Sequence, residues 1–251
     1  MCRHLAYLGR PRTLRSLIYD GDHSLEHQTY APRLNVGNVL NADGFGVGWY
    51  VDGADEPLRF RRAQPLWTDA SFREISGAVA TGCAVAAIRS ATVGFPVDES
   101  CAQPFRAGRR LFSHNGIVAD FARVEAKLRE LAAPVDADAR APVDSALLFA
   151  LAARAWADGA DLAAGLAAVV GTVTGLAEGR FNLLAADGAS LAATAVGDSL
   201  FVREGPDGVE LASEPTDGAP GWRRVPDRSL VSADASGVSV TPLEGATWTA
   251  S

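Results

Sequence analysis

The apolar positions toward the two ends of the chain follow the alternation that is typical of β-strands. In residues 2–8, Leu5 and Tyr7 fall on one face of an extended segment and His4 falls on the other. Further strands are predicted from short apolar runs bounded by turn residues, at 44–51, 82–90, 110–113, 181–186, 190–196, 199–203 and 209–213.

The middle of the chain has helical spacing instead. In residues 119–132 the apolar side chains recur every three to four positions. Two further helices are expected over residues 144–156 and 162–177, and Asp161 is positioned to cap the second. The uncharged segment 162–177 is shorter than the roughly 20 residues of a membrane span, so a packed helix is expected there. Strands interrupted by helices without regular alternation predict an α+β fold.

Length and composition are those of an ordinary globular protein. The 251 residues are 48% hydrophobic and 21% charged, and no repeat or long linker divides them, so a single domain over residues 1–251 is expected. The net charge is −7 and the arginines are scattered, with no basic stripe. Nucleic acid and anionic membranes are therefore not expected as partners. The sequence carries no signal for an oligomeric state.

Cysteine usage and the first residues indicate a compartment. The three cysteines, Cys2, Cys83 and Cys101, form no C-x-x-C pair, which argues against a disulfide framework and a structural zinc site. The N-terminal segment has arginines and no apolar run, so a signal peptide is not expected. These features predict a cytoplasmic protein.

A glycine-rich segment at residues 44–48 resembles the start of a dinucleotide-binding motif. That motif requires a helix to open on its last glycine. Here Trp49, Tyr50 and Val51 continue as a strand. The favoured interpretation is a glycine-rich strand that lets another backbone or a ligand approach closely.

The segment from His23 to His27 matches the H-x-x-E-H pattern of some zinc peptidases. The pattern needs a true helix and a distant carboxylate ligand, and the flanking residues leave room for only a short helix. A short surface helix with solvated histidines is the favoured interpretation.

Cys2 combines two features that nucleophilic catalysis needs. Removal of the initiator Met1, which is usual before a small residue, would leave the Cys2 thiol beside a free α-amine. An α-amine has a reference pKa of about 7.7–8.0, so part of it is neutral base near pH 7. One residue can then supply the nucleophile and its proton acceptor, as in N-terminal nucleophile enzymes. The alternative is a small buried hydrophobic residue.

Other residues are suited to binding an amino-acid-like acyl group. The Asn115 side-chain amide and the Gly116 N–H could stabilise an oxyanion, although an Asn-Gly turn after the predicted strand is the alternative. Arg89 ends an otherwise apolar strand, where a charge is costly unless it meets a partner or a ligand. Asp144 begins a predicted helix, where capping is the alternative role.

Taken together, these segments resemble the class II glutamine amidotransferase domain of the N-terminal nucleophile (Ntn) hydrolase superfamily. Each motif alone is weak, but five in the family's order over residues 1–160 are specific. The matching segments are Met1-Cys2, Asn41-Ala42-Asp43-Gly44-Phe45-Gly46, Arg89-Ser90-Ala91-Thr92, His114-Asn115-Gly116 and Asp144-Ser145.

The resemblance implies a four-layer αββα sandwich of two antiparallel sheets, with the active site at one end of the sheets. It implies that Cys2 is the nucleophile, with its own amine as the base. Asn115 and Gly116 would form the oxyanion hole. No metal and no organic cofactor are implied.

The resemblance also implies how a substrate is held. Arg89 and Asp144 would bind the α-carboxylate and α-ammonium of a γ-glutamyl group, and Thr92 would line the pocket. The family usually has His before this arginine and Trp after it, where this sequence has Ile88 and Ser90. Many amidotransferases continue into a synthetase domain where this sequence ends, so water is the expected acceptor.

Within the stand-alone branch of the family, residues 1–9 and 43–50 are most similar to the amidohydrolases of ergothioneine biosynthesis. The resemblance implies hydrolysis of the γ-glutamyl amide of γ-glutamyl-hercynylcysteine sulfoxide through a cysteine thioester. One alternative is a glutaminase subunit that supplies ammonia to a separate synthetase. The others are a non-catalytic γ-glutamyl-binding module and, more distantly, a metal-dependent hydrolase.

Overall fold

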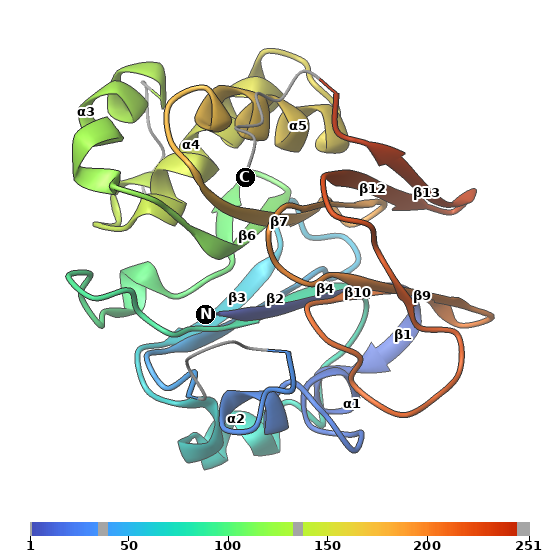
Figure 1. The fold of residues 1–251 in the computed structure, drawn as a ribbon. Helices are drawn as coiled ribbons and strands as arrows, with labels where there is room; N and C mark the ends of the chain where they lie inside the picture. The colour runs from blue at the N-terminus through green and yellow to red at the C-terminus, as the bar shows by residue number, and fades with distance from the viewer. Residues whose placement is uncertain (1, 35–39, 133–137, 245–251) are drawn as a thin grey trace.

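The computed structural model describes residues 2–34, 40–132 and 138–244, and its strands form two antiparallel sheets (Figure 1). The strands of the first sheet are β1 (Arg3–Thr13), β2 (Phe45–Trp49), β3 (Leu58–Arg62), β4 (Ala80–Ile88), β9 (Phe201–Gly205), β10 (Gly208–Ala212) and β11 (Arg223–Arg224). Those of the second are β5 (Phe105–Ala107), β6 (Arg110–Val118), β7 (Gly179–Ala186), β8 (Leu191–Ala195), β12 (Ser229–Asp234) and β13 (Gly237–Pro242). The spatial orders are β11-β9-β10-β1-β4-β2-β3 and β13-β12-β8-β7-β6-β5.

Helices cover the outer face of each sheet (Figure 1). The first sheet carries α1 (Leu14–Ile18) and α2 (Ala70–Ile75), and the second carries α3 (Phe121–Ala132), α4 (Asp144–Ala157) and α5 (Leu162–Thr174). Short 3-10 helices are η1 (His27–Thr29), η2 (Leu66–Thr68), η3 (Glu99–Cys101) and η4 (Asp138–Arg140). This arrangement confirms the predicted α+β class and the four-layer αββα sandwich. No helix of the described residues has both the length and the apolar character needed to cross a bilayer.

Three hydrophobic clusters separate the four layers. In β1, Leu5 and Tyr7 join the cluster beneath α1 and α2, whereas Ala6 joins the cluster between the two sheets. The alternation in the sequence therefore predicted the two faces of this strand correctly. The third cluster lies between the second sheet and helices α3 to α5.

The predicted helices form with small differences in their ends. Asp161 caps α5, because its Oδ1 accepts a hydrogen bond of 2.7 Å from the Ala164 amide. In α3, Val124 and Leu128 are buried and most intervening positions are exposed, as the helical spacing predicted. Helix α4 is buried almost all round because it lies against the second sheet and between α3 and α5.

The glycines of β2 let the second sheet and its connections approach closely. A Cβ on Gly46 would lie 2.3 Å from the carbonyl oxygen of Gln103, and one on Gly48 would lie 2.6 Å from a Leu111 methyl group. This confirms the predicted close approach. Strand β2 continues to Trp49 and opens no helix, so it lacks the geometry of a dinucleotide-binding motif.

Two parts of the sequence interpretation need correction. Strand β6 continues to Val118, well beyond the predicted end at 113. The shorter or more charged elements were not recognised, because the strands have too few alternating apolar positions, and the helices too few turns, to stand out from loops. These unrecognised elements are α1, α2, β3, β5, β11, β12 and β13.

We expect Gly46→Ala to lower the free energy of unfolding by about 1–3 kcal/mol, because the methyl group would overlap a backbone carbonyl. The matched control is Gly205→Ala in β9, where an added Cβ has no neighbour within 4 Å. The control should stay within about 0.5 kcal/mol of the wild type. Urea unfolding followed by tryptophan fluorescence measures both, and equal effects would contradict the close packing of β2.

Candidate active site

The register of the first sheet brings Cys2 and Arg89 to the same edge. Arg3 pairs with Ile88 across β1 and β4, so Cys2 and Arg89 each lie one residue beyond this pair. The Cys2 side chain is only partly buried, and its Sγ lies 3.7 Å from the carbonyl oxygen of Ser90, to which it donates. The predicted nucleophile and the predicted carboxylate-binding arginine are therefore neighbours.

Arg89 is buried and is held by the loops that leave β4 and enter β2. Its Nη1 donates to the carbonyl oxygens of Pro96 at 2.9 Å and Asp43 at 3.4 Å. The Asp43 carboxylate in turn accepts from the Ala91 amide at 2.8 Å. Thr92 lies in the same loop and is half-buried. These contacts fold the Thr92 loop around the arginine.

The second sheet supplies Asn115 and Gly116, but not from a turn. Both residues lie inside β6, where they pair with Asn182 and Phe181 of β7. The Asn-Gly turn that was the alternative interpretation is wrong, because both residues belong to an unbroken antiparallel ladder. A Cβ at Gly116 would lie 1.9 Å from the Arg180 carbonyl oxygen, so the packing requires glycine there.

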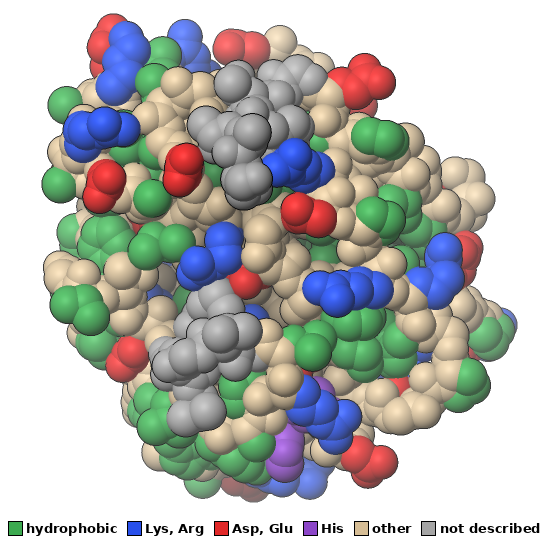
Figure 2. Space-filling model, in the orientation of Figure 1, with side chains coloured by type: hydrophobic (Ala, Val, Ile, Leu, Met, Phe, Trp, Pro, Cys, Tyr) green, Lys and Arg blue, Asp and Glu red, His purple; other side chains and the backbone are tan. Residues whose placement is uncertain are grey.

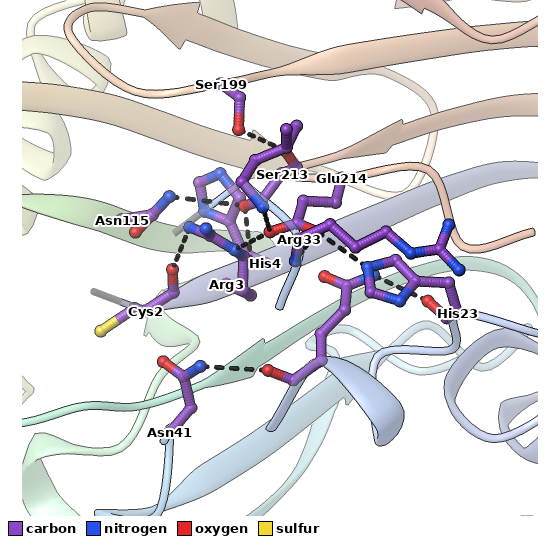
Figure 3. Close-up of polar contacts among 12 residues, drawn as sticks. Cys2, Arg3, His4, His23, Arg33, Asn41, Asn115, Ser199, Ser213 and Glu214 are labelled. Carbon is purple, nitrogen blue, oxygen red and sulfur yellow. Dashed lines mark hydrogen bonds and ion pairs between the residues drawn. The ribbon is translucent and has the colours of Figure 1, made fainter. Parts of the chain in front are cut away.

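Ser213 joins the two sheets at the site (Figure 3). Its Oγ accepts from the backbone amide of His4 at 3.0 Å and from Asn115 Nδ2 at 3.4 Å. Asn115 is fully buried, and its Oδ1 has no hydrogen-bond partner among the described residues. An amide carries two N–H donors, so the long bond to Ser213 leaves one donor of Asn115 for a ligand.

Asp144 links the end of β6 to the start of α4. It is the first residue of α4, but its carboxylate does not cap that helix in the usual way. Its Oδ2 accepts from the Val118 amide at 2.9 Å, and its Oδ1 accepts from the Ser145 amide at 2.7 Å. The carboxylate is buried and stays beside the strand that carries Asn115.

Two buried histidines support the site in the neutral form. Burial, together with electrostatic repulsion from His114 and Arg3 when His4 is protonated, lowers the pKa of His4 to about 3. Burial also lowers the pKa of His114, although Asp144 opposes this. The His114 ring bridges Ser145 Oγ and the Arg180 carbonyl oxygen, each at 2.9 Å. A carbonyl can only accept, so we assign the proton of His114 to Nε2.

The sequence interpretation missed a buried ion pair beside the predicted nucleophile, Cys2. The side chains of Arg3 and Glu214 are each only 1% exposed, and Arg3 Nε lies 2.8 Å from Glu214 Oε1. Arg3 Nη1 donates to the Cys2 carbonyl oxygen at 3.1 Å. The pair therefore fixes the backbone of Cys2 (Figure 3). A charge at the end of a predicted strand was the only signal for Glu214 in the sequence.

Glu214 collects three more donors from the segment that contains the two histidines of the H-x-x-E-H match. Its Oε2 accepts from His23 Nε2 and from the Arg33 amide, both at 2.8 Å, and its Oε1 accepts from the Leu34 amide at 3.1 Å. His23 is 1% exposed, so the expectation of a solvated histidine on a surface helix is wrong for this residue. Its partner is a carboxylate 191 residues away.

The metal-binding alternative finds no support in this geometry. Among the described residues, no three His, Cys, Asp or Glu side chains come together as a metal site would require.

The two cysteines other than Cys2 are unsuited to nucleophilic attack. Burial raises the pKa of the Cys83 thiol to about 12 and raises that of Cys101.

The hydrogen bonds of Glu214 have a consequence for stability at acid pH. Burial alone would raise its pKa, but the His23 hydrogen bond, the two backbone amides and the Arg3 charge lower it to about 2. A carboxyl with a lowered folded-state pKa stabilises the fold above its ordinary pKa of 4.5, and this stabilisation is lost as the pH falls toward 2.

We expect Glu214→Gln to lower the free energy of unfolding by about 3–5 kcal/mol near pH 7, because Arg3 would stay buried without a counter-charge. The difference from the wild type should shrink as the pH falls below about 4.5. Urea unfolding over this pH range measures it, with the exposed Glu204→Gln as control. A difference that is independent of pH would show that the Glu214 charge is not what stabilises the fold.

The fold is shared with solved structures of low sequence identity. A glutamine aminotransferase class-II domain protein from Silicibacter pomeroyi superposes with a TM-score of 0.72 at 24% identity, over 96% of this chain and 99% of that one. The glutamine phosphoribosylpyrophosphate amidotransferase of Bacillus subtilis gives a TM-score of 0.69 at 17% identity, over 97% of this chain and 49% of that one.

Sequence comparison identifies closer relatives. A γ-glutamyl-hercynylcysteine sulfoxide hydrolase of Mycolicibacterium smegmatis is 43% identical over 97% of this chain and all of its own length. A protein of the same name from Mycobacterium tuberculosis is 42% identical over 98% of both chains. The model of the class II glutamine amidotransferases matches residues 18–214, which include Arg89, Asn115 and Asp144. The chain therefore belongs to the class II glutamine amidotransferase family.

Proposed function

We propose that the protein is an amidohydrolase that cleaves the γ-glutamyl amide of γ-glutamyl-hercynylcysteine sulfoxide, releasing glutamate and hercynylcysteine sulfoxide. The observation that carries this proposal is the 42–43% identity, over nearly the whole chain, to hydrolases named for this substrate. The placement of Cys2 beside Arg89, and of Asn115 across the Ser213 bridge, supports it.

The reaction begins at Cys2 once Met1 has been removed. The α-amine of Cys2 takes the thiol proton, and the sulfur attacks the γ-carbonyl carbon of the substrate. The negative charge that develops on the carbonyl oxygen is stabilised by Asn115 Nδ2 and the Gly116 N–H. Removing one such donor costs about 2.7–4 kcal/mol of transition-state stabilisation in other acyl-transfer enzymes.

The second half of the reaction uses the same groups in reverse. The tetrahedral intermediate collapses, the C–N bond breaks, and the Cys2 α-ammonium protonates the leaving amine. Water then attacks the thioester with the α-amine as base. The C–S bond breaks, glutamate leaves and the thiol is restored.

The glutamyl group is held by charges of opposite sign on the two sides of the site. Arg89 binds the α-carboxylate, and its bonds to the Pro96 and Asp43 carbonyls keep the guanidinium in place. Asp144 binds the α-ammonium and is itself oriented by two backbone amides. Thr92 lines the pocket between them. This set of contacts requires no metal or organic cofactor.

We expect Cys2→Ala to reduce kcat/KM for the γ-glutamyl substrate by about 10⁴-fold or more, because the nucleophile is lost while the fold is kept. Glutamate release from the purified protein measures this. The control is Cys83→Ala, a buried thiol away from the proposed chemistry, which should remain active. Turnover that survives in Cys2→Ala would disprove the mechanism.

The state of the Cys2 nitrogen gives a second test. A chain made with a removable N-terminal extension should be inactive until a protease exposes Cys2, because an amide nitrogen cannot act as a base. General-base catalysis contributes about 10²–10⁴-fold, which sets the expected gain. For the processed enzyme, kcat/KM should rise with pH as the α-amine loses its proton and becomes a base. Intact mass reports the processing, and full activity of the extended chain would exclude the amine as base.

A further inference from the structure

Asn41 is a buried asparagine in the loop that enters β2, and it has no part in the reaction steps given above. It is 0% exposed. Its backbone amide donates to the Thr29 carbonyl oxygen at 2.7 Å, and its Nδ2 donates to the Gln28 carbonyl oxygen at 3.1 Å. These two bonds tie the loop to η1 and fix the orientation of the Asn41 side chain.

The register of the first sheet places Asn41 at the edge that carries Cys2. Ile88 of β4 pairs with Arg3 on one side and with Phe45 on the other. Cys2 directly precedes Arg3 in the chain, and Asn41 lies four residues before Phe45. The segments that carry Cys2 and Asn41 therefore leave the sheet at the same edge.

The chain that leaves β4 runs between these two segments. The Asp43 amide donates to the Arg89 carbonyl oxygen at 3.0 Å, so the loop that carries Asn41 stays paired with this chain. On the other side, Cys2 Sγ donates to the Ser90 carbonyl oxygen at 3.7 Å. The Cys2 thiol is therefore directed over the chain that separates it from Asn41, and Figure 3 shows the two side chains next to each other.

The side-chain oxygen of Asn41 is buried and has no hydrogen-bond partner among the described residues. A carbonyl can only accept, so the bond to Gln28 identifies the nitrogen branch of the Asn41 amide and leaves the oxygen on the other branch. Figure 3 shows this oxygen turned away from the dashed bond of Nδ2 and toward Cys2. A buried acceptor without a donor costs free energy, so this oxygen is suited to a donor that Cys2 supplies.

Removal of Met1 creates such donors at Cys2. In the unprocessed chain the Cys2 nitrogen is an amide with one N–H, whereas a free α-amine has two and an α-ammonium has three. The two nearby guanidinium groups already hold other partners. Arg3 binds Glu214 and the Cys2 carbonyl oxygen, and Arg89 binds backbone carbonyl oxygens.

We propose that Asn41 Oδ1 accepts a hydrogen bond from the α-amine of processed Cys2 and positions this amine as the base and acid of the reaction. With one N–H on Asn41, the lone pair of the neutral amine is turned toward the thiol and takes its proton. The bond to Asn41 strengthens when the amine becomes an ammonium, because the donor is then charged. The ammonium gives that proton to the leaving nitrogen and keeps its other N–H on Asn41. The inference rests on the proposed function, in which the Cys2 amine is the base.

The charged groups around Cys2 stay the same in every variant of the test. They are Arg3, Asp43, Arg89, Asp144, Asp198 and Glu214, and each is hydrogen-bonded within the described structure. His4 and His114 are neutral, because burial lowers the pKa of both. On the face shown in Figure 2, Lys and Arg are interspersed with Asp and Glu, so no single sign dominates this surface. A change in the titration of the amine between variants therefore reports the contact at position 41.

The test uses three variants of the processed enzyme, with intact mass to confirm that Met1 is removed. Asn41→Leu removes the oxygen at similar volume, and Asn41→Asp replaces the amide with a carboxylate that faces the amine. Gln28→Met is the matched control. It removes a buried hydrogen bond of the same loop, from Gln28 Nε2 to the His23 carbonyl oxygen at 2.9 Å, that does not involve Cys2. Thermal unfolding of each variant measures the stability that is lost.

The α-amine is titrated by NMR in protein labelled with ¹⁵N-cysteine, where the nitrogens of Cys83 and Cys101 are amides and are resolved from it. We expect Asn41→Leu to move the midpoint of this titration to lower pH by about one unit, because the ammonium loses an acceptor. Asn41→Asp should move the midpoint to higher pH, because the ammonium gains a counter-charge. Gln28→Met should leave the midpoint unchanged.

Kinetics on γ-glutamyl-hercynylcysteine sulfoxide give a second readout. We expect Asn41→Leu to lower kcat by about tenfold or more with KM within about threefold, because the contact is to the base and not to the glutamyl group. In Asn41→Asp the rise of kcat/KM with pH should move to higher pH, so that raising the pH restores much of the rate. Gln28→Met should keep the pH profile of the wild type.

Opposite shifts of the amine titration in the two Asn41 variants, absent from Gln28→Met, would establish the contact. Titrations that coincide in the wild type and both Asn41 variants would overturn it, and so would a shift in one direction that Gln28→Met shares. The titration needs no substrate, so it decides the contact by itself. A processed wild type that releases no glutamate from the sulfoxide substrate would instead overturn the proposed function.

Discussion

The placement of the proposed nucleophile depends on a charge pair buried one residue along the chain from it. The first residues of a domain are usually poorly ordered unless something ties them down. Here Arg3 and Glu214 are both removed from water, and Arg3 also binds the Cys2 carbonyl. Burying two charges costs free energy that their mutual attraction repays only when further hydrogen bonds satisfy them. Glu214 has these bonds, because His23 and two backbone amides complete its set of donors.

This pair also decides where the segment after α1 can lie. The amides of Arg33 and Leu34 can reach Glu214 only if the chain returns across the end of β10. The proposed nucleophile, the loop beside it and the start of the C-terminal segment are therefore positioned by one carboxylate. Ser213, the residue before this carboxylate, bonds to the second sheet through Asn115. Residues 213 and 214 thus connect both sheets and the N-terminal strand at one point.

The order of the local motifs was predictable from the sequence, and their three-dimensional partners were not. The faces of β1, the α+β class and the close approach at β2 all follow from short-range patterns, and the structure agrees with them. Asn115 and Gly116 were expected just after a strand ending at 113, with an Asn-Gly turn as the alternative interpretation. The ladder with β7 overrides that preference, and it depends on residues far away in the sequence. The roles proposed for the site residues remain predictions.

Glu214 and His23 show why the remainder could not be read from the sequence. A lone Glu near a strand end and a histidine between polar residues are ordinary surface patterns. Only the fold shows that the two side chains form a buried hydrogen bond, although they lie 191 residues apart in the sequence. The same limit applies to Asn182, whose side chain satisfies four backbone groups of one turn. Patterns of period 2 or 3.6 report which face is apolar, and they carry no information about which distant polar group completes a buried site.

The structure holds the residues of the proposed site in two different ways. Asn115 and Asp144 are held by buried hydrogen bonds of their own side chains, so a substitution there disturbs the fold as well as the chemistry. Cys2 is held through its backbone carbonyl, so its side chain can be replaced while the fold is kept. A substitution at Cys2 therefore separates the chemistry from the stability of the fold, and one at Asn115 or Asp144 does not.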